Sequence, residues 1–274
     1  MEQEIEKKHF EIITIKPNVS NDFLFAELQK TLVPNEKNFI TIFDEFINSK
    51  KHTTSESFVK KLITLKNRLV EFSEQSNTNL NFENLNLLFS EKFTNYLIEV
   101  ENYANNSIEK LLSLLKTFIR WANMSEYCNI SNLDFLKYKK NETDTFALTL
   151  DELRRISKLK IIDSDYMKRS RDAFVVACMS GVRFSDVKQI SKTQVKDGIL
   201  ELRQQKTKAI TEIPINSEIT KILESYKEDK PFAELTNQVV NRNLKEIAKQ
   251  SGIDEQITNS KISGAKVITT TNNN

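Results

Sequence analysis

The sequence predicts an α+β protein that is mainly α-helical, with one small antiparallel β-hairpin and two domains. Its 274 residues are 39% hydrophobic, which is enough to bury a core in each domain. The whole chain holds 4 glycines and 4 prolines, which favours long helices over many short strands. Apolar residues also recur at the spacing of amphipathic helices over long stretches.

The N-terminal half is expected to hold a weakly patterned segment and then a helical domain. Residues 1–36 show little periodicity; Ile12–Ile15 is a candidate short strand without an assigned function. Residues 37–125 are expected to form four amphipathic helices, and Thr54 and Ser55 are candidate caps of the second one. The four apolar stripes are Phe39, Phe43, Phe46 and Ile47; Phe58, Leu62, Leu65, Leu69 and Phe72; Phe89, Phe93, Tyr96, Leu97 and Val100; and Ile108, Leu111, Leu112, Leu115, Phe118, Ile119 and Ala122.

Basic side chains occupy helix faces that the apolar stripes leave exposed. Lys60, Lys61 and Arg68 share one side of the second helix, and Lys116 and Arg120 lie on the fourth. Such faces can follow the phosphate backbone of a nucleic acid. They can equally be ordinary solvent-exposed faces, and the sequence leaves both interpretations open.

The second half of the chain is expected to form a separate domain after a linker. Residues 126–148 are polar and charged and interrupt the periodicity, which is typical of a domain boundary. Residues 149–274 then begin with a capping box at Thr149–Glu152. The other expected elements are a buried helix at Ala173–Met179, strands at Ile199–Gln205 and Ile210–Ile215, and helices at Glu218–Tyr226 and Gln238–Gln250. After Gly252 the pattern fades, and Thr269–Asn274 carries no fold signal.

Composition and charge narrow the classes of function. No apolar run is long enough to span a bilayer and the N-terminus lacks the apolar core of a signal peptide, so we expect no membrane partner. The 2 cysteines lie far apart and favour neither a disulfide framework nor a metal site, so we expect a protein of the reducing cytoplasm. Residues 1–145 carry 18 basic and 21 acidic side chains, whereas residues 146–274 carry 22 and 17. The second domain is therefore expected to attract polyanions.

Two cations of the second domain lie at positions that suit a phosphate-binding site. Arg183 follows Gly181, where the apolar helix is expected to end, and stands at the start of the next helix. Lys206 and Lys208 lie at the tip of the predicted hairpin. Arginine can donate to two phosphate oxygens at once, and rigid elements hold such groups in place. A structural salt bridge at Arg183 and an ordinary exposed turn at Lys206 are the alternatives.

These residues carry a resemblance to a known family. The block SGVRFSDV at Ser180–Val187, the lysine-tipped hairpin that ends in Ile213-Pro214, and the stretch Leu148–Leu153 resemble the tyrosine recombinases, the phage-integrase family found in mobile elements. The resemblance implies that residues 37–125 are a helical, SAM-like core-binding domain and residues 149–274 part of an integrase-type catalytic domain. Residues 1–36 would then be what remains of an arm-type domain.

The resemblance also implies a chemistry. In this family a tyrosine attacks a DNA phosphate without a metal or other cofactor, and tetramers cleave and rejoin duplex DNA during integration and recombination. Arg183 matches the first arginine that stabilises the phosphate oxygens, and Lys206 matches the lysine that donates a proton to the leaving oxygen. Lys208 is expected to contact the DNA backbone instead.

The sequence departs from the family pattern after the hairpin. The histidines are His9 and His52, no arginine follows Arg242, and no tyrosine follows Tyr226, so neither the family's His-x-x-Arg box nor its nucleophilic tyrosine has a counterpart. We therefore expect a C-terminally truncated recombinase that binds duplex DNA as a monomer or weak assembly and does not cleave it. The alternative is a helical DNA-binding regulator or competitor without recombinase chemistry.

Overall fold

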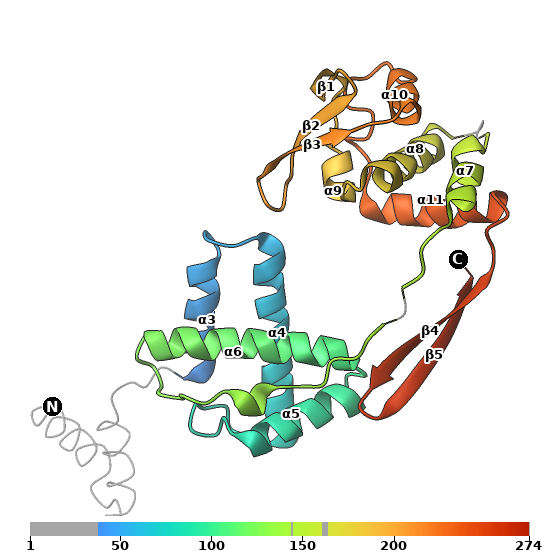
Figure 1. Cartoon of the computed structure of the whole chain (residues 1–274). Coiled ribbons are helices and arrows are strands. Elements are labelled where there is room, and N and C mark those ends of the chain that lie inside the picture. Colours follow the sequence, from blue (N-terminus) through green and yellow to red (C-terminus); the bar gives the residue numbers. More distant parts are fainter. Residues whose placement is uncertain (1–37, 144, 161–163, 274) are drawn as a thin grey trace, which may run out of the picture. The chain divides into compact units, whose positions relative to one another are not determined.

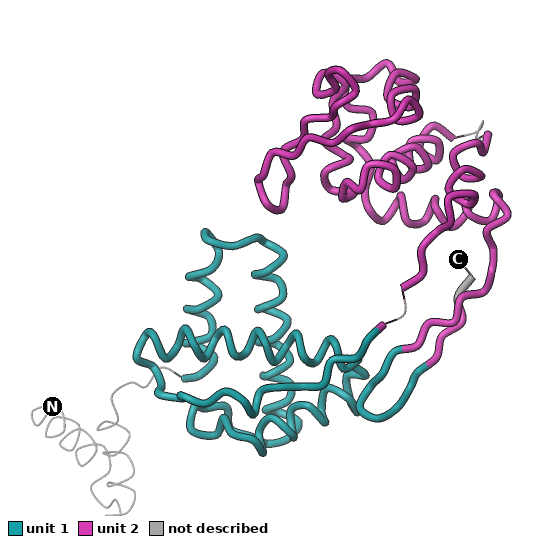
Figure 2. The backbone as a smooth tube through the Cα atoms, in the orientation of Figure 1, with its two compact units in different colours: residues 1–142, 261–268 teal, residues 143–260, 269–274 magenta. Residues whose placement is uncertain are grey.

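The computed structural model of the chain describes residues 38–143, 145–160 and 164–273. The chain divides into two compact units, shown in teal and magenta in Figure 2. Unit 1 comprises residues 1–142 and 261–268, and unit 2 comprises residues 143–260 and 269–274. The segment 1–36, with the candidate strand at Ile12–Ile15, lies outside the described residues.

Unit 1 contains the four helices that the apolar periodicity predicts. They are α3 (Phe39–Lys50), α4 (Glu56–Ser76), α5 (Leu87–Glu99) and α6 (Asn105–Met124), and Figure 1 shows α6 lying across α3 and α4. Side chains of Asn38, Ser55 and Asn86 accept a backbone hydrogen bond from the first turn of α3, α4 and α5. These bonds satisfy amides that a helix start leaves unpaired, so they set where each helix begins. Ser55, and not Thr54, is thus the cap of α4.

The core of unit 1 is built around the ring of Phe118 on α6, which is fully buried. Its ring centroid lies 4.3 Å from that of Phe43 and 5.2 Å from that of Phe39. The predicted stripes are confirmed as core, with two exceptions. Phe58 is only partly buried, and Val100 is 51% exposed because α5 ends before it.

The chain stays in unit 1 beyond the end of α6. Residues 126–142, where the linker was expected to begin, contain the 3-10 turn η1 (Asp134–Leu136), and Leu136 is 1% exposed in the core of unit 1. Asn141 pairs with α6: its backbone amide donates to the side chain of Asn106 at 2.8 Å, and its own side chain accepts from Asn105 at 2.8 Å. The chain enters unit 2 only at residue 143.

Unit 2 packs its helices around α8. The helices are α7 (Leu150–Lys158), α8 (Asp165–Ser180), α9 (Phe184–Val187), α10 (Ser217–Glu224) and α11 (Asn237–Gln250). The predicted capping box is present, because the Thr149 side chain accepts from the Glu152 amide and the Glu152 side chain accepts from the Thr149 amide. Helix α8 is longer than the apolar run Ala173–Met179 because its polar first turns are capped by Ser164.

A three-stranded antiparallel sheet lies beside these helices, in the order β1-β2-β3. Its strands are β1 (Val195–Lys196), which follows the 3-10 turn η2 (Lys192–Gln194), β2 (Ile199–Arg203) and β3 (Ile210–Pro214). Asp197 and Gly198 both have positive φ, at 51° and 75°, which is the geometry of a tight hairpin turn. Leu200 and Leu202 point into the core, so the register of β2 is fixed by burial.

The segment Thr269–Asn274, for which the sequence gives no fold signal, forms a strand in the part that the structure describes. Strand β5 (Lys266–Asn273) pairs with β4 (Gln256–Ser263) in a second hairpin. The turn is at Gly264, whose φ of +61° suits glycine, and its amide donates to the side chain of Asn105 at 2.7 Å. These strands are largely polar and exposed, so they lack the apolar alternation by which a strand is recognised.

Candidate nucleic-acid interface

Arg183 is held at the junction of two helices. Helix α8 ends at Gly181, which adopts φ +68° and donates its amide to the carbonyl of Ala177 at 2.9 Å. That left-handed residue turns the chain, and two positions later Arg183 is the N-cap of α9. Its backbone is fixed by the carbonyl that accepts from the Asp186 amide at 2.8 Å, while its side chain is exposed.

Two hydrogen bonds join this junction to the turn 204–209, which links β2 to β3. The amide of Gln205 donates to the carboxylate of Asp186 at 2.7 Å, and Asp186 itself is 1% exposed. Arg183 Nη1 donates to the side-chain oxygen of Gln204 at 3.0 Å. The structure therefore brings Arg183 against the turn that carries Lys206.

The turn 204–209 presents two further cations to solvent. Lys206 and Lys208 are both exposed. Lys208 has φ +61°, and its amide donates to the carbonyl of Gln204 at 2.9 Å, which closes the turn. Among the residues that the structure describes, the Lys206 ammonium has no hydrogen-bond or ion-pair partner. An open pocket of about 600 Å³ lies beside the turn, and its lining includes Lys188, Gln205 and Lys230.

The five cations singled out in unit 1 differ in how strongly they are engaged. Lys61 and Arg120 are exposed, and Lys60 is an exposed partner of Glu56 at 2.7 Å. Lys116 is half-buried, and burial, with a smaller effect of the nearby Lys137 charge, lowers the pKa of its ammonium group.

Arg68 is the most constrained of these cations. Its guanidinium group pairs with Glu71, lies 2.9 Å from Glu101 and donates to the hydroxyl of Tyr103 at 3.4 Å. The hydrogen bond with Tyr103 is the chief cause of a raised pKa of this guanidinium, with the two carboxylates adding to it. Arg68 thus joins α4 to the segment after α5.

Solved structures of lambda integrase have a fold similar to that of this chain. A lambda integrase dimer of residues 75–356 bound to a COC′ core site matches with a TM-score of 0.61 at 18% identity, over 79% of this chain and 82% of that one. A lambda integrase tetramer bound to a Holliday junction gives 0.61 at 17%, over 86% and 78%. Lambda integrase residues 75–356 bound to DNA give 0.59 at 17%, over 78% and 79%. A search of curated proteins found no match.

A family model agrees with the fold. Residues 38–142 match the phage integrase SAM-like domain. The chain therefore resembles phage integrases in sequence over residues 38–142 and has the fold of lambda integrase over most of its length. The match ends at the last residue of the continuous part of unit 1, so residues 126–142 belong to this domain in sequence as well as in packing.

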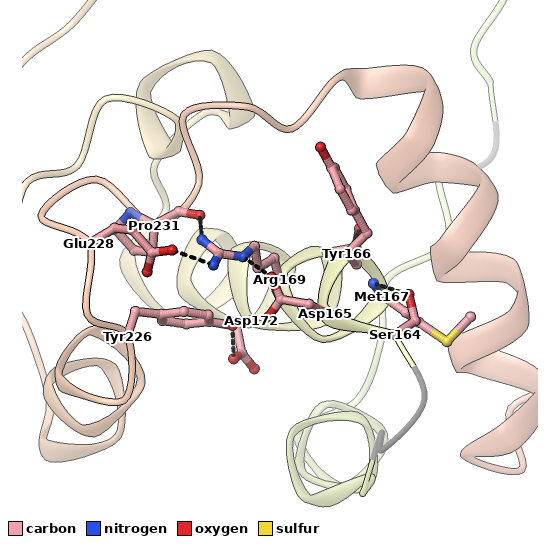
Figure 3. A network of polar contacts seen from close by, with 10 residues as sticks. Ser164, Asp165, Tyr166, Met167, Arg169, Asp172, Tyr226, Glu228 and Pro231 are labelled. Carbon is pink, nitrogen blue, oxygen red and sulfur yellow. Dashed lines mark hydrogen bonds and ion pairs between the residues drawn. The ribbon is translucent and has the colours of Figure 1, made fainter.

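Tyr226, the last tyrosine of the chain, is part of a buried polar network. It is 6% exposed, and its hydroxyl donates to Asp172 at 2.6 Å (Figure 3). Asp172 also pairs with Arg171 at 2.6 Å, and the cations of Lys168 and Arg169 lie 4.8 and 4.9 Å from the Tyr226 ring centre. Burial, and then the hydrogen bond to Asp172, raises the pKa of the Tyr226 hydroxyl. This tyrosine is therefore built into the core of unit 2.

Arg169 extends the same network to the loop after α10. Its guanidinium donates to Asp165, to Glu228 and to the carbonyl of Pro231, at 2.6 to 2.8 Å (Figure 3). The network therefore ties the first turns of α8 to residues 226–231.

The described part of the chain contains no group of three or more His, Cys, Asp or Glu side chains arranged to hold a metal ion. None of the helices that the structure describes combines the length and the apolar character needed to cross a bilayer.

Proposed function

We propose that the chain binds duplex DNA and that the junction of Arg183 with the turn 204–209 lies on a phosphate. The observation that carries this proposal is the pairing of Arg183 with Gln204, which brings an exposed guanidinium against a turn with two exposed lysines. Lambda integrase, which has the same fold, is bound to DNA in its solved structures. Cations on rigid supports are suited to hold a phosphate in one orientation.

The remaining cations are assigned to the DNA backbone unless carboxylates already hold them inside the fold. We assign the exposed Lys60, Lys61, Arg120 and Lys208, and the half-buried Lys116, to sequence-independent contacts with the DNA backbone. Arg68 is assigned a structural role instead, because Glu71 and Glu101 already offset its charge.

The chemistry proposed for this fold is strand cleavage and rejoining in site-specific recombination of a mobile element, in the cytoplasm. Arg183 would stabilise the charge on the phosphate oxygens, and Lys206 would donate a proton to the leaving oxygen. These steps require neither a metal nor another cofactor. A nucleophile must complete the site, and the buried Tyr226 is unsuited to that role.

We further propose that these 274 residues alone bind DNA without cleaving it, as a monomer or weak assembly. Groups that act as one catalytic unit lose nearly all activity when the nucleophile is missing. The second candidate function, a DNA-binding regulator or competitor, is favoured by the same burial of Tyr226. In that function Arg183 positions the protein by contact with a phosphate.

The DNA-binding proposal predicts a salt-dependent affinity that depends on Arg183 and Lys206. Affinity for duplex DNA should fall linearly with salt on logarithmic axes, because bound cations release counterions. Replacing both residues by alanine should reduce the slope by about two and weaken binding at low salt at least tenfold, on the order expected for two charged contacts. Fluorescence anisotropy over a salt series measures both quantities.

A matched control is Lys196→Ala, because Lys196 is exposed on β1 at the end of the sheet away from the turn 204–209. The salt dependence of DNA affinity in Lys196→Ala should have the same slope as in the wild type. An affinity without salt dependence, or one that the double substitution leaves unchanged, would rule the proposed interface out.

Because Tyr226 is buried and unsuited to act as the nucleophile, we predict that these 274 residues form no covalent link with DNA. Incubation with a nicked suicide substrate, which traps phosphotyrosyl intermediates, should give no slower band on a denaturing gel. A covalent band that disappears in the variant Tyr226→Phe would contradict the assignment of Tyr226 to the core. A band that persists in that variant would assign the chemistry to another residue and would equally refute the proposal.

A further inference from the structure

Gln204 is the centre of the hydrogen bonds that join Arg183 to the turn 204–209. Its side-chain oxygen accepts from Arg183 Nη1 at 3.0 Å and from the Thr207 hydroxyl at 2.9 Å. Its side-chain nitrogen donates to the hydroxyl of Thr211 on β3 at 3.1 Å. One carboxamide thereby links the helix junction, the turn and the next strand.

The chemistry of the carboxamide suits it to hold a cation that must remain charged. A glutamine is neutral, so it orients the guanidinium of Arg183 without cancelling its charge. A carboxylate at the same position would form an ion pair with Arg183 and compete with a phosphate for it. A purely apolar side chain would leave the guanidinium free to adopt many rotamers, which must be frozen when it binds.

We propose that Gln204 is a positioning residue that sets the guanidinium of Arg183 beside Lys206 for contact with a DNA phosphate. This inference rests on the proposed function. In this inference Gln204 acts through Arg183, because its carboxamide oxygen already accepts from Arg183 and Thr207 and one of its two amide hydrogens is donated to Thr211. Its effect on DNA binding should then disappear when Arg183 is removed.

Two substitutions separate orientation from charge. Gln204→Met keeps the length of the side chain but removes its hydrogen bonds, so DNA affinity should fall roughly fivefold, the effect of about one hydrogen bond, with an unchanged salt slope. Gln204→Glu should neutralise Arg183, so its affinity and its salt slope should approach those of Arg183→Ala, a slope smaller by about one. Anisotropy with a fluorescent duplex measures all variants, and circular dichroism verifies that each is folded.

A double-mutant cycle with Arg183→Ala is the decisive measurement. In the Arg183→Ala background, Gln204→Met should leave DNA affinity unchanged. Gln204→Glu should there weaken DNA affinity no more than Gln205→Glu does. The latter is the matched control, because Gln205 is exposed on the same turn and the described contacts of Arg183 do not include its side chain. A new charge at residue 205 repels DNA equally with and without Arg183.

The double-mutant cycle has two kinds of outcome. Effects at residue 204 that disappear without Arg183 support the inference. Effects of the same size in both backgrounds, or substitutions at residue 204 that leave DNA affinity unchanged, overturn it. Failure of the proposed function is detected before any substitution at residue 204 is measured. In that case the wild type binds no DNA, or Arg183→Ala binds DNA as tightly as the wild type does. Either result overturns the inference about Gln204 together with the proposed function.

Discussion

The substitution Phe118→Ala should destabilise unit 1 by about 3 to 5 kcal/mol, a large share of the stability of an ordinary domain. The ring of Phe118 is fully buried, and its centroid lies within 6 Å of those of Phe39, Phe43 and Phe46. Removing it leaves a cavity that these neighbouring rings, fixed on α3, cannot fill without moving the helix. The loss therefore combines the transfer free energy of the ring with the cost of the cavity.

The single tryptophan of the chain makes this measurement specific to unit 1. The Trp121 ring lies 6.4 Å from that of Phe118, so its fluorescence reports on this core during unfolding in urea. The control Ile63→Ala changes a residue of α4 that is 40% exposed, and should cost under about 1 kcal/mol. If Phe118→Ala shifts the fluorescence transition no further than the control does, the ring is not the centre of the core.

The same core explains why the helices of unit 1 could be predicted from sequence. Apolar residues at helical spacing are a local signal, and each stripe had to bury its face against the others. The packing of residues 126–142 had no such signal. Leu136 is a single apolar residue in a polar stretch, and Asn141 is held by hydrogen bonds to residues 35 and 36 positions away.

In the candidate site, too, the residues with a local sequence signal could be predicted, whereas the contacts between distant residues could not. The sequence block around Arg183 and the lysines of the turn could be recognised locally. The contact between Arg183 and Gln204 spans 21 positions, and a glutamine at the end of a strand is not distinctive. Nor could the sequence show that Arg68 is neutralised, because Glu101 lies 33 residues beyond it on a different segment. Long-range pairing of this kind follows from the folded structure alone.

Tyr226→Phe should destabilise unit 2 near neutral pH by about 1 to 3 kcal/mol. The substitution keeps the ring against Phe232, at 5.8 Å between centroids, but removes the hydroxyl that donates to Asp172. The carboxylate is then left buried with Arg171 as its remaining partner among the described residues. Urea unfolding followed by circular dichroism measures the change, with Trp121 fluorescence recorded in parallel to separate unit 1.

The pH dependence of this difference tests the buried hydroxyl directly. The pKa of Tyr226 is raised in the folded state above its ordinary value of 10.0, so the folded chain keeps this proton at a pH where the unfolded chain loses it. The stabilising contribution is complete below pH 10 and is lost as the pH rises further. Above pH 10 the wild type should lose about 1.4 kcal/mol per pH unit through this one group, whereas Tyr226→Phe should not.

The advantage of the wild type over Tyr226→Phe should therefore shrink between pH 9 and pH 11. Tyr166→Phe is the control, since Tyr166 is on the same helix as Asp172 but is 51% exposed, and this variant should keep the pH dependence of the wild type. Parallel curves for wild type and Tyr226→Phe would mean that the hydroxyl ionises as readily in the folded chain as in the unfolded one. A hydroxyl of that kind could act as a nucleophile, whereas one that holds its proton against Asp172 stabilises the fold instead.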